Sequence, residues 1–202
     1  MDSDKKARHN DRMARKKAVV DAAIERAQTE RGVVIVITGN GKGKSTSGFG
    51  TLFRALGHGQ NVGVVQFIKG TQATGEVIFL QQCALPSVQY FAMATGFTWN
   101  TQNWDADKQA ADEAWSHASA LLADPAVDLV LLDELTYMLK YHFLDEAQVL
   151  DAIAARPEGQ TVVITGRAAQ PALRELADTV SEIAAEKHAF KGGIKARAGV
   201  DF

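Results

Sequence analysis

The chain has 202 residues, of which 46% are hydrophobic and 23% charged, a composition typical of one soluble globular domain. No apolar stretch approaches membrane-spanning length, and no secretory signal is visible. The single cysteine, Cys83, excludes an internal disulfide and any multi-cysteine metal site. We therefore expect a cytoplasmic protein in which Cys83 is a small buried residue.

Charge is unevenly distributed along the chain. Residues 1–31 carry nine Lys/Arg against six Asp/Glu, a net charge of +3, whereas the remainder carries 13 against 18, a net charge of −5. Residues 4–30 lack Gly and Pro and predict a polar helix, so residues 1–30 are expected to form an arm beside a domain of residues 31–202. The isoelectric point of about 6.2 and the lack of interleaved aromatic residues argue against a dedicated nucleic-acid binder.

Beyond the arm, predicted strands and helices alternate. Strands are predicted at residues 33–37, 62–68, 88–93, 127–132, 161–164 and 179–183, and helices at 45–56, 105–122, 146–154 and 171–177. Nearly continuous Val/Ile/Leu runs are typical of parallel strands, so we expect an α/β fold with a mostly parallel sheet flanked by helices on both faces. Ligands of such sheets bind beyond the carboxyl ends of the strands. We expect four strand ends to border one site: Thr38, Lys69, Asp133 and Thr165.

The sequence TGNGKGKST, here called the Gly-rich loop (residues 38–46), lies between the first strand and the first helix after the arm. Such loops aim backbone N–H groups at phosphate oxygens, and the helix adds the positive end of its dipole. We expect a triphosphate to be held by Gly39, Asn40, Gly41, Lys42, Gly43, Lys44, Ser45 and Thr46. Lys44 supplies charge for the outer phosphates, and the Ser45 hydroxyl can ligate Mg²⁺. The usual spacing, G-x-x-x-x-G-K-[ST], would require glycine where Thr38 stands, so the loop is one residue short.

Acidic and basic residues stand at three other strand ends. The segment VDLVLLDELTY ends its apolar run in Asp133 and Glu134, which can hold Mg²⁺ or Mn²⁺ opposite Ser45. The pattern leaves open which acid contacts the metal, and Asp133 could instead cap the next helix. Lys69 and Arg167 could add positive charge near the phosphates or be solvated surface charges.

Two further segments have unusual compositions. In ATGFTWNTQNW, Phe97 and Trp99 stand in an otherwise polar loop, where they either fold back into the core or form an apolar platform for a large planar ligand. The C-terminal segment HAFKGGIKARAGVDF (residues 188–202) contains three Lys/Arg and three glycines. Such a segment suits a loop that folds over an anionic ligand, or an exposed end without a task.

The chain resembles the corrinoid (cob(I)alamin) adenosyltransferases of the P-loop CobA/CobO/BtuR type from about residue 27 to residue 202. The resemblance is carried by GNGKGKST, GHGQNVGVVQFIKG, MATGFTWNTQN, LLDELTY, TVVITGR and KHAFKGGIKARAGVDF. The shortened Gly-rich loop belongs to that family's pattern, whereas residues 77–92 depart from it. The resemblance implies a P-loop NTPase (RecA-like) fold. It also implies transfer of the 5′-deoxyadenosyl group of ATP to Co(I) of cobalamin or a cobyrinic acid a,c-diamide, with release of triphosphate.

The resemblance also implies partners and residue roles. ATP and a corrinoid are the substrates, Mg²⁺ or Mn²⁺ accompanies ATP, a flavoprotein is the reductant, and the enzyme is a homodimer. Lys44 would stabilise the leaving group, while Phe97 and Trp99 would press on the lower corrin face, displace the axial base and ease reduction to Co(I). The arm would close over the corrinoid as a lid. The same Gly-rich loop would also suit a phosphohydrolase or small-molecule kinase, or a nucleotide sensor whose basic arm binds nucleic acid.

Overall fold

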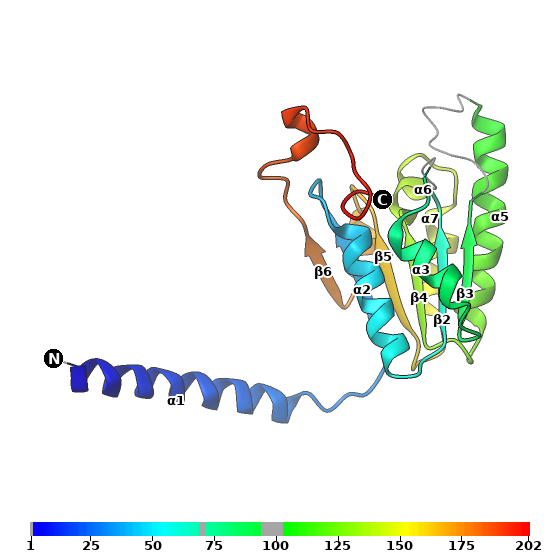
Figure 1. Cartoon of the computed structure of the whole chain (residues 1–202). Coiled ribbons are helices and arrows are strands. Elements are labelled where there is room, and N and C mark those ends of the chain that lie inside the picture. The colour runs from blue at the N-terminus through cyan, green and yellow to red at the C-terminus, as the bar shows by residue number, and fades with distance from the viewer. Residues whose placement is uncertain (1, 69–71, 94–102) are drawn as a thin grey trace. The chain divides into compact units, whose positions relative to one another are not determined.

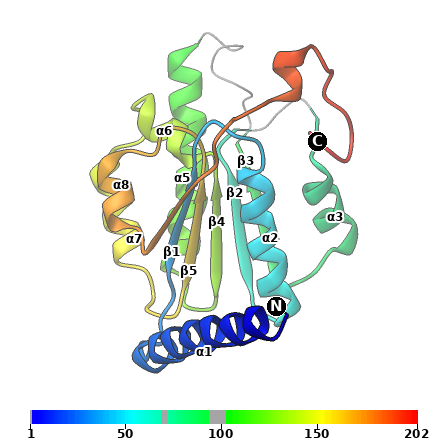
Figure 2. The same ribbon diagram turned by 90° about the vertical axis from the view of Figure 1, so that its left-hand side faces the viewer.

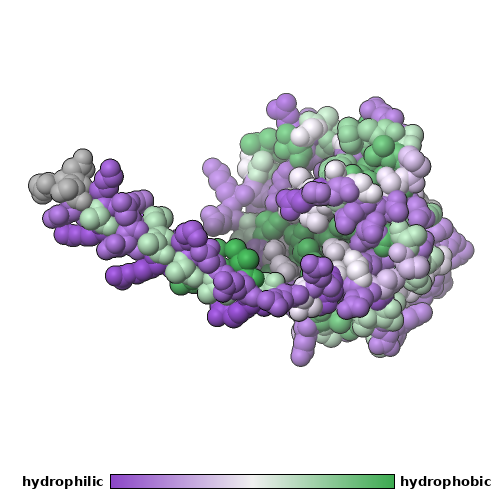
Figure 3. All heavy atoms as spheres, turned by 90° about the horizontal axis from the view of Figure 1, so that it is seen from below, coloured by the Kyte–Doolittle hydropathy of each residue, from purple (hydrophilic) through white to green (hydrophobic). Residues whose placement is uncertain are grey.

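The computed structural model describes residues 2–68, 72–93 and 103–202. The chain forms two compact units, Met1–Glu30 and Arg31–Phe202. The first contains α1 (Asp2–Arg26), which ends four residues before the predicted end of this helix at residue 30. Its surface is mostly hydrophilic (Figure 3), although Val19, Val20 and Ile24 are exposed near its C-terminal end. Within the described part of the chain, no helix combines the length and apolar character needed to cross a membrane.

The second unit is built on a sheet of six strands (Figure 1). In chain order they are β1 (Val34–Thr38), β2 (Val62–Gln66), β3 (Val88–Ala92), β4 (Leu129–Asp133), β5 (Thr161–Thr165) and β6 (Thr179–Glu182). Their spatial order is β3-β2-β4-β5-β1-β6, and each neighbouring pair is parallel. The predicted parallel α/β sheet is confirmed, and the six strands agree with the predicted ones to within one or two residues.

Helices cover both faces of this sheet (Figure 2). On one face lie α2 (Lys44–Gly57) and α3 (Gly75–Cys83). The other face carries α5 (Trp104–Ala123), α6 (Leu135–Lys140), α7 (Glu146–Ala154) and α8 (Pro171–Leu176). A short 3-10 helix, η1 (Ala189–Gly192), lies in the C-terminal segment.

Alternate strand residues feed two separate hydrophobic cores. On β4, Leu129 and Leu131 point into the core beneath α2 and α3, whereas Val130 and Leu132 point into the core beneath α5 to α8. Both faces of the strand are therefore buried, which explains why its sequence is continuously apolar rather than alternating. Full burial of each such side chain contributes about 1.5–3 kcal/mol to folding.

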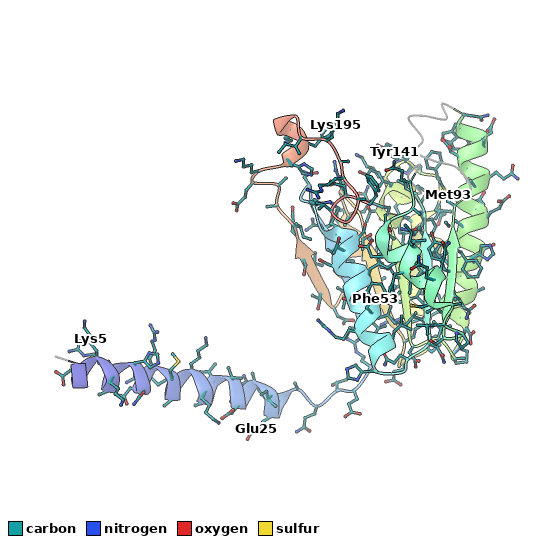
Figure 4. All side chains as sticks on the ribbon, in the orientation of Figure 1. Lys5, Glu25, Phe53, Met93, Tyr141 and Lys195 are labelled. Carbon is teal, nitrogen blue, oxygen red and sulfur yellow. The ribbon has the colours of Figure 1, made fainter. Side chains whose placement is uncertain are left out.

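The sequence did not predict α3 or α6. Only Val77 and Leu80 of α3 are buried, while Ile78 and Phe79 are exposed, so its apolar residues show no clear period. Phe79 instead meets the ring of Phe53 on α2 edge-on, with centroids 5.6 Å apart (Phe53 is labelled in Figure 4). The prediction for Cys83 was wrong: this last residue of α3 is exposed, because residues 81–86 at the end of the helix are all uncovered.

Candidate functional site

The Gly-rich loop joins the end of β1 to the start of α2 and packs on the chain that follows β6. The Gly41 N–H donates to the Ile183 carbonyl at 2.7 Å, and a Cβ on Gly41 would lie 2.6 Å from the Ala184 carbonyl oxygen. Gly39 and Gly43 have φ values of 101° and 111°, in the region that favours glycine. The loop therefore needs its glycines both for its path and for its close approach to the backbone.

Lys44 is a buried cation at the start of α2. The residue is 6% exposed, and its Nζ donates to the Gly41 carbonyl oxygen at 2.7 Å. Burial lowers the pKa of the Lys44 ammonium, and the neighbouring charge of Glu134 opposes that shift. A buried ammonium at the positive end of a helix dipole makes this position strongly attractive to an anion.

A cavity of about 660 Å³ opens beside the loop. Its walls come from the Gly-rich loop and α2, from the ends of β2 and β4, from the start of α3, and from the C-terminal segment. The charged and hydroxyl-bearing groups that face it include Lys42, Lys44, Ser45, Thr46, Asp133 and Glu134. The ends of β2 and β4, far apart in the sequence, thus meet at one cavity. Of the four strand-end residues predicted to border the site, Asp133 lines this cavity, Thr38 and Thr165 are fully buried outside its wall, and Lys69 lies outside the described residues.

Asp133 lies at the centre of a hydrogen-bonded chain that crosses four neighbouring strands. It is 3% exposed, and its two carboxylate oxygens accept from Gln66 Nε2 at 2.9 Å and from Thr165 Oγ1 at 2.5 Å. Gln66 Oε1 in turn accepts from the Tyr90 hydroxyl at 2.6 Å, and burial raises the pKa of that hydroxyl. Side chains from the middle of β3 and from the ends of β2, β4 and β5 therefore hold one another in place around Asp133.

Glu134 differs from Asp133 in having an oxygen to offer. Its Oε2 is buried and has no hydrogen-bond partner within the described ranges. Burial, reinforced by the charge of Asp133, raises the pKa of Glu134 to about 7. Its backbone has φ 61°, and its N–H donates to Thr165 Oγ1 at 3.1 Å. The next turn is tight, because a Cβ on Gly166 would lie 2.0 Å from the Thr136 hydroxyl and 3.1 Å from Glu134 Oε2.

The other predicted site residues are placed as follows. Thr38 is buried, and its Oγ1 accepts from the Ala169 N–H at 3.2 Å. Arg167 is exposed, and its charge opposes the rise in the pKa of Glu134. Asn40 is exposed on the Gly-rich loop. Three predicted site residues lie outside the described residues: Lys69, Phe97 and Trp99.

The structure adds residues that the sequence did not single out. These are Gln66, Tyr90, Thr136 and Asp201. The signal for Gln66 was one polar residue in an otherwise apolar strand, and that for Asp201 was the motif-like C-terminal segment. Asp201 forms an ion pair with Lys42 of the Gly-rich loop, Nζ to Oδ1 at 2.9 Å.

Comparison with known families decides how this site is understood. The model of the ATP:corrinoid adenosyltransferase family BtuR/CobO/CobP matches residues 30–202. The model of the cob(I)alamin adenosyltransferase N-terminal region matches residues 1–24. The chain belongs to the ATP:corrinoid adenosyltransferase family.

Individual members of this adenosyltransferase family are similar to the chain over nearly its whole length. The corrinoid adenosyltransferase of Escherichia coli strain K12 is 53% identical over 195 residues, covering 96% of this chain and 98% of that protein. The corrinoid adenosyltransferase of Pseudomonas aeruginosa strain PAO1 is 55% identical over 199 residues, covering 98% of each. CobA of Salmonella typhimurium strain LT2 is 52% identical over 195 residues, covering 96% and 98%. The resemblance seen in the motifs is confirmed, and the phosphohydrolase or kinase alternative is not favoured.

Proposed function

We propose that this protein is a corrinoid adenosyltransferase that moves the 5′-deoxyadenosyl group of ATP to Co(I) of cobalamin or of a cobyrinic acid a,c-diamide. A Co–C5′ bond forms with the electron pair of Co(I), and the C5′–O bond breaks with its pair leaving on triphosphate. The step needs no general base, so the protein's tasks are positioning, charge neutralisation and exclusion of water. Membership of the adenosyltransferase family is the observation that carries the proposal.

In this proposal the Gly-rich loop holds the triphosphate leaving group. Its residues are Gly39, Asn40, Gly41, Lys42, Gly43, Lys44, Ser45 and Thr46. The buried ammonium of Lys44 supports this assignment, because desolvated charge interacts more strongly with an anion than charge in water. Anchoring ATP by the group it loses leaves C5′ free to face the corrinoid.

A magnesium ion would be held by Ser45 and Glu134, with Mn²⁺ as a substitute. Mg²⁺ sites in nucleotide enzymes use one or two carboxylates together with substrate phosphates, and both of these residues line the cavity. The unpartnered Oε2 of Glu134 supports this choice over Asp133, whose two oxygens already accept hydrogen bonds. When bound, the ion would neutralise charge growing on the triphosphate. Asp133 would act by positioning Glu134.

Phe97 and Trp99 are proposed to displace the axial base from the corrin. The chain on either side of them is anchored at the carboxyl edge of the sheet, which supports this role. Met93 (labelled in Figure 4) is buried, and its N–H donates to the Gln66 carbonyl at 2.9 Å. The Asn103 side chain caps α5 by accepting from the Ala106 N–H at 3.2 Å. We further propose that residues 1–30 act as a lid, that a flavoprotein reduces the corrinoid, and that the enzyme is a homodimer.

An anaerobic assay tests the function directly. The protein is mixed with MgATP and chemically reduced cobalamin or cobyrinic acid a,c-diamide. A light-sensitive alkylcorrinoid spectrum should develop, with one triphosphate released for each corrinoid converted, and the ratio of kcat/KM values would identify the preferred acceptor. Formation of ADP or orthophosphate from ATP, in place of triphosphate, would contradict the proposal. Lys44→Met serves as the inactive control, and Arg54→Met, at an exposed position of the same helix, as its matched control.

A further inference from the structure

The C-terminal segment forms a compact loop, and the side-chain carboxylate of its Asp201 reaches Lys42 of the Gly-rich loop. The Asp201 N–H donates to the Arg197 carbonyl at 2.9 Å, and Asp201 Oδ2 accepts from the Arg197 N–H at 3.1 Å. Gly199 N–H donates to the Phe202 carbonyl at 2.7 Å, which closes the loop. One Asp201 oxygen is thus fixed within its own segment, and the other, Oδ1, lies 2.9 Å from Lys42 Nζ. In Figure 1 this segment lies beside the N-terminal end of α2.

This ion pair stands in the wall of the cavity proposed to hold the triphosphate. Lys42 and Asp201 both line it, together with Lys44 and Ser45. The hydrogen bond from Lys42 lowers the pKa of Asp201, so its carboxylate is charged at neutral pH. The side chains of Lys42 and Asp201 are 45% and 30% exposed, and an ion pair this open to water is weak enough to exchange.

We infer that Asp201 competes with polyphosphate for Lys42 and so promotes release of the triphosphate product. The inference rests on the proposed function, because it needs the triphosphate to occupy the Gly-rich loop. Bound triphosphate draws Lys42 away from Asp201 because it carries several negative charges. When triphosphate leaves, the carboxylate replaces it on Lys42. Since Asp201 belongs to the same chain, it acts at a high effective concentration.

Tripolyphosphate binding to the full chain tests the inference without any corrinoid. Isothermal titration at constant ionic strength compares the wild type with Asp201→Asn and with Glu186→Gln. The second variant removes the same charge from an exposed position outside the cavity wall. We expect Asp201→Asn to lower the dissociation constant about two- to fivefold, as the worth of an exposed ion pair predicts, and Glu186→Gln to leave it unchanged. An unchanged or higher dissociation constant in Asp201→Asn would overturn the inference.

A double-mutant cycle separates exchange at Lys42 from simple repulsion between Asp201 and the ligand. Lys42→Met should weaken tripolyphosphate binding, and adding Asp201→Asn to it should cause no further change. Equal tightening in both backgrounds would overturn the exchange. Absence of tripolyphosphate binding to the wild type would count against the proposed function as well. Formation of the alkylcorrinoid with no effect of Asp201→Asn would remove the inference alone.

Discussion

The Thr165 hydroxyl on β5 donates a hydrogen bond to Asp133 on the neighbouring strand β4, with Oγ1 and Oδ1 2.5 Å apart. The same hydroxyl oxygen accepts from the Glu134 N–H at 3.1 Å. One fully buried side chain at the end of β5 therefore fixes both acids of the adjacent strand end. The two carboxylates differ in what remains available, since only Glu134 keeps a buried oxygen without a partner in the described residues.

Replacing Thr165 by Val should therefore destabilise the fold and disturb the site together. The change leaves a buried Asp133 oxygen without its donor, which costs about 1–3 kcal/mol of unfolding free energy. Urea denaturation measures that loss, and Thr165→Ser, which keeps the hydroxyl, is the matched control. A Thr165→Val protein as stable as the serine variant would show that this hydrogen bond does not hold Asp133.

Glu134 should make the stability of the metal-free protein depend on pH. Its pKa rises from 4.5 to about 7 on folding, so between these values the unfolded state loses a proton that the folded state keeps. The free energy of unfolding should then fall by about 2–3 kcal/mol as pH rises from about 4.5 to 7. Denaturation across this range should show the fall in the wild type and a flatter profile in Glu134→Gln. Mg²⁺ affinity should rise as the pH passes the Glu134 pKa of about 7, because the carboxylate that binds the ion must be ionised.

Two glycine substitutions in one region should have opposite effects. Gly43 has φ 111° and open space where a Cβ would stand, so Gly43→Ala should cost about 1–3 kcal/mol through backbone strain alone. Gly50, inside α2, also has open space but an ordinary helical backbone, so Gly50→Ala should stabilise the protein by about 0.5–1 kcal/mol. Thermal or urea unfolding measures both. A neutral Gly43→Ala would argue against the left-handed turn at the start of α2.

Phe97 and Trp99 are predicted to matter for reduction rather than for alkyl transfer. Phe97→Ala and Trp99→Ala should reduce turnover from Co(II) far more than turnover from chemically reduced Co(I). The reason is that displacement of the axial base lowers the energy of the acceptor orbital. Trp104→Ala is the matched control, since Trp104 is 57% exposed at the start of α5 and meets Phe143 with ring centroids 6.0 Å apart. Equal losses in the two assays would refute the role.

The sheet could be predicted because strands that are buried on both faces have nearly continuous apolar sequences. Runs such as residues 127–132 have no polar residue except Asp128, so their burial could be read directly. The Gly-rich loop could also be predicted from the sequence, because its backbone geometry requires glycines and its charge requires Lys44. Predicted boundaries moved by only a few residues, as with β4, which extends to include Asp133.

The partners of the site residues were beyond reach of the same reasoning. Asp133 and Glu134 have similar side chains, and only the strand order shows that Gln66 and Thr165 lie on either side of Asp133. The pairing of Lys42 with Asp201 joins residues almost the whole domain apart in sequence. Such contacts depend on tertiary structure and leave no periodic signal.

The position of β5 between β1 and β4 has a mechanical consequence. Two inter-strand spacings of about 4.8 Å separate the strand that leads into the Gly-rich loop from the strand that ends in the acids. Backbone hydrogen bonds set this interval, so no single side-chain replacement can widen or narrow it. Substitutions at the carboxyl edge of the sheet can therefore change charge and ligand affinity. The distance between the Gly-rich loop and the two acids is instead set by the backbone of the sheet.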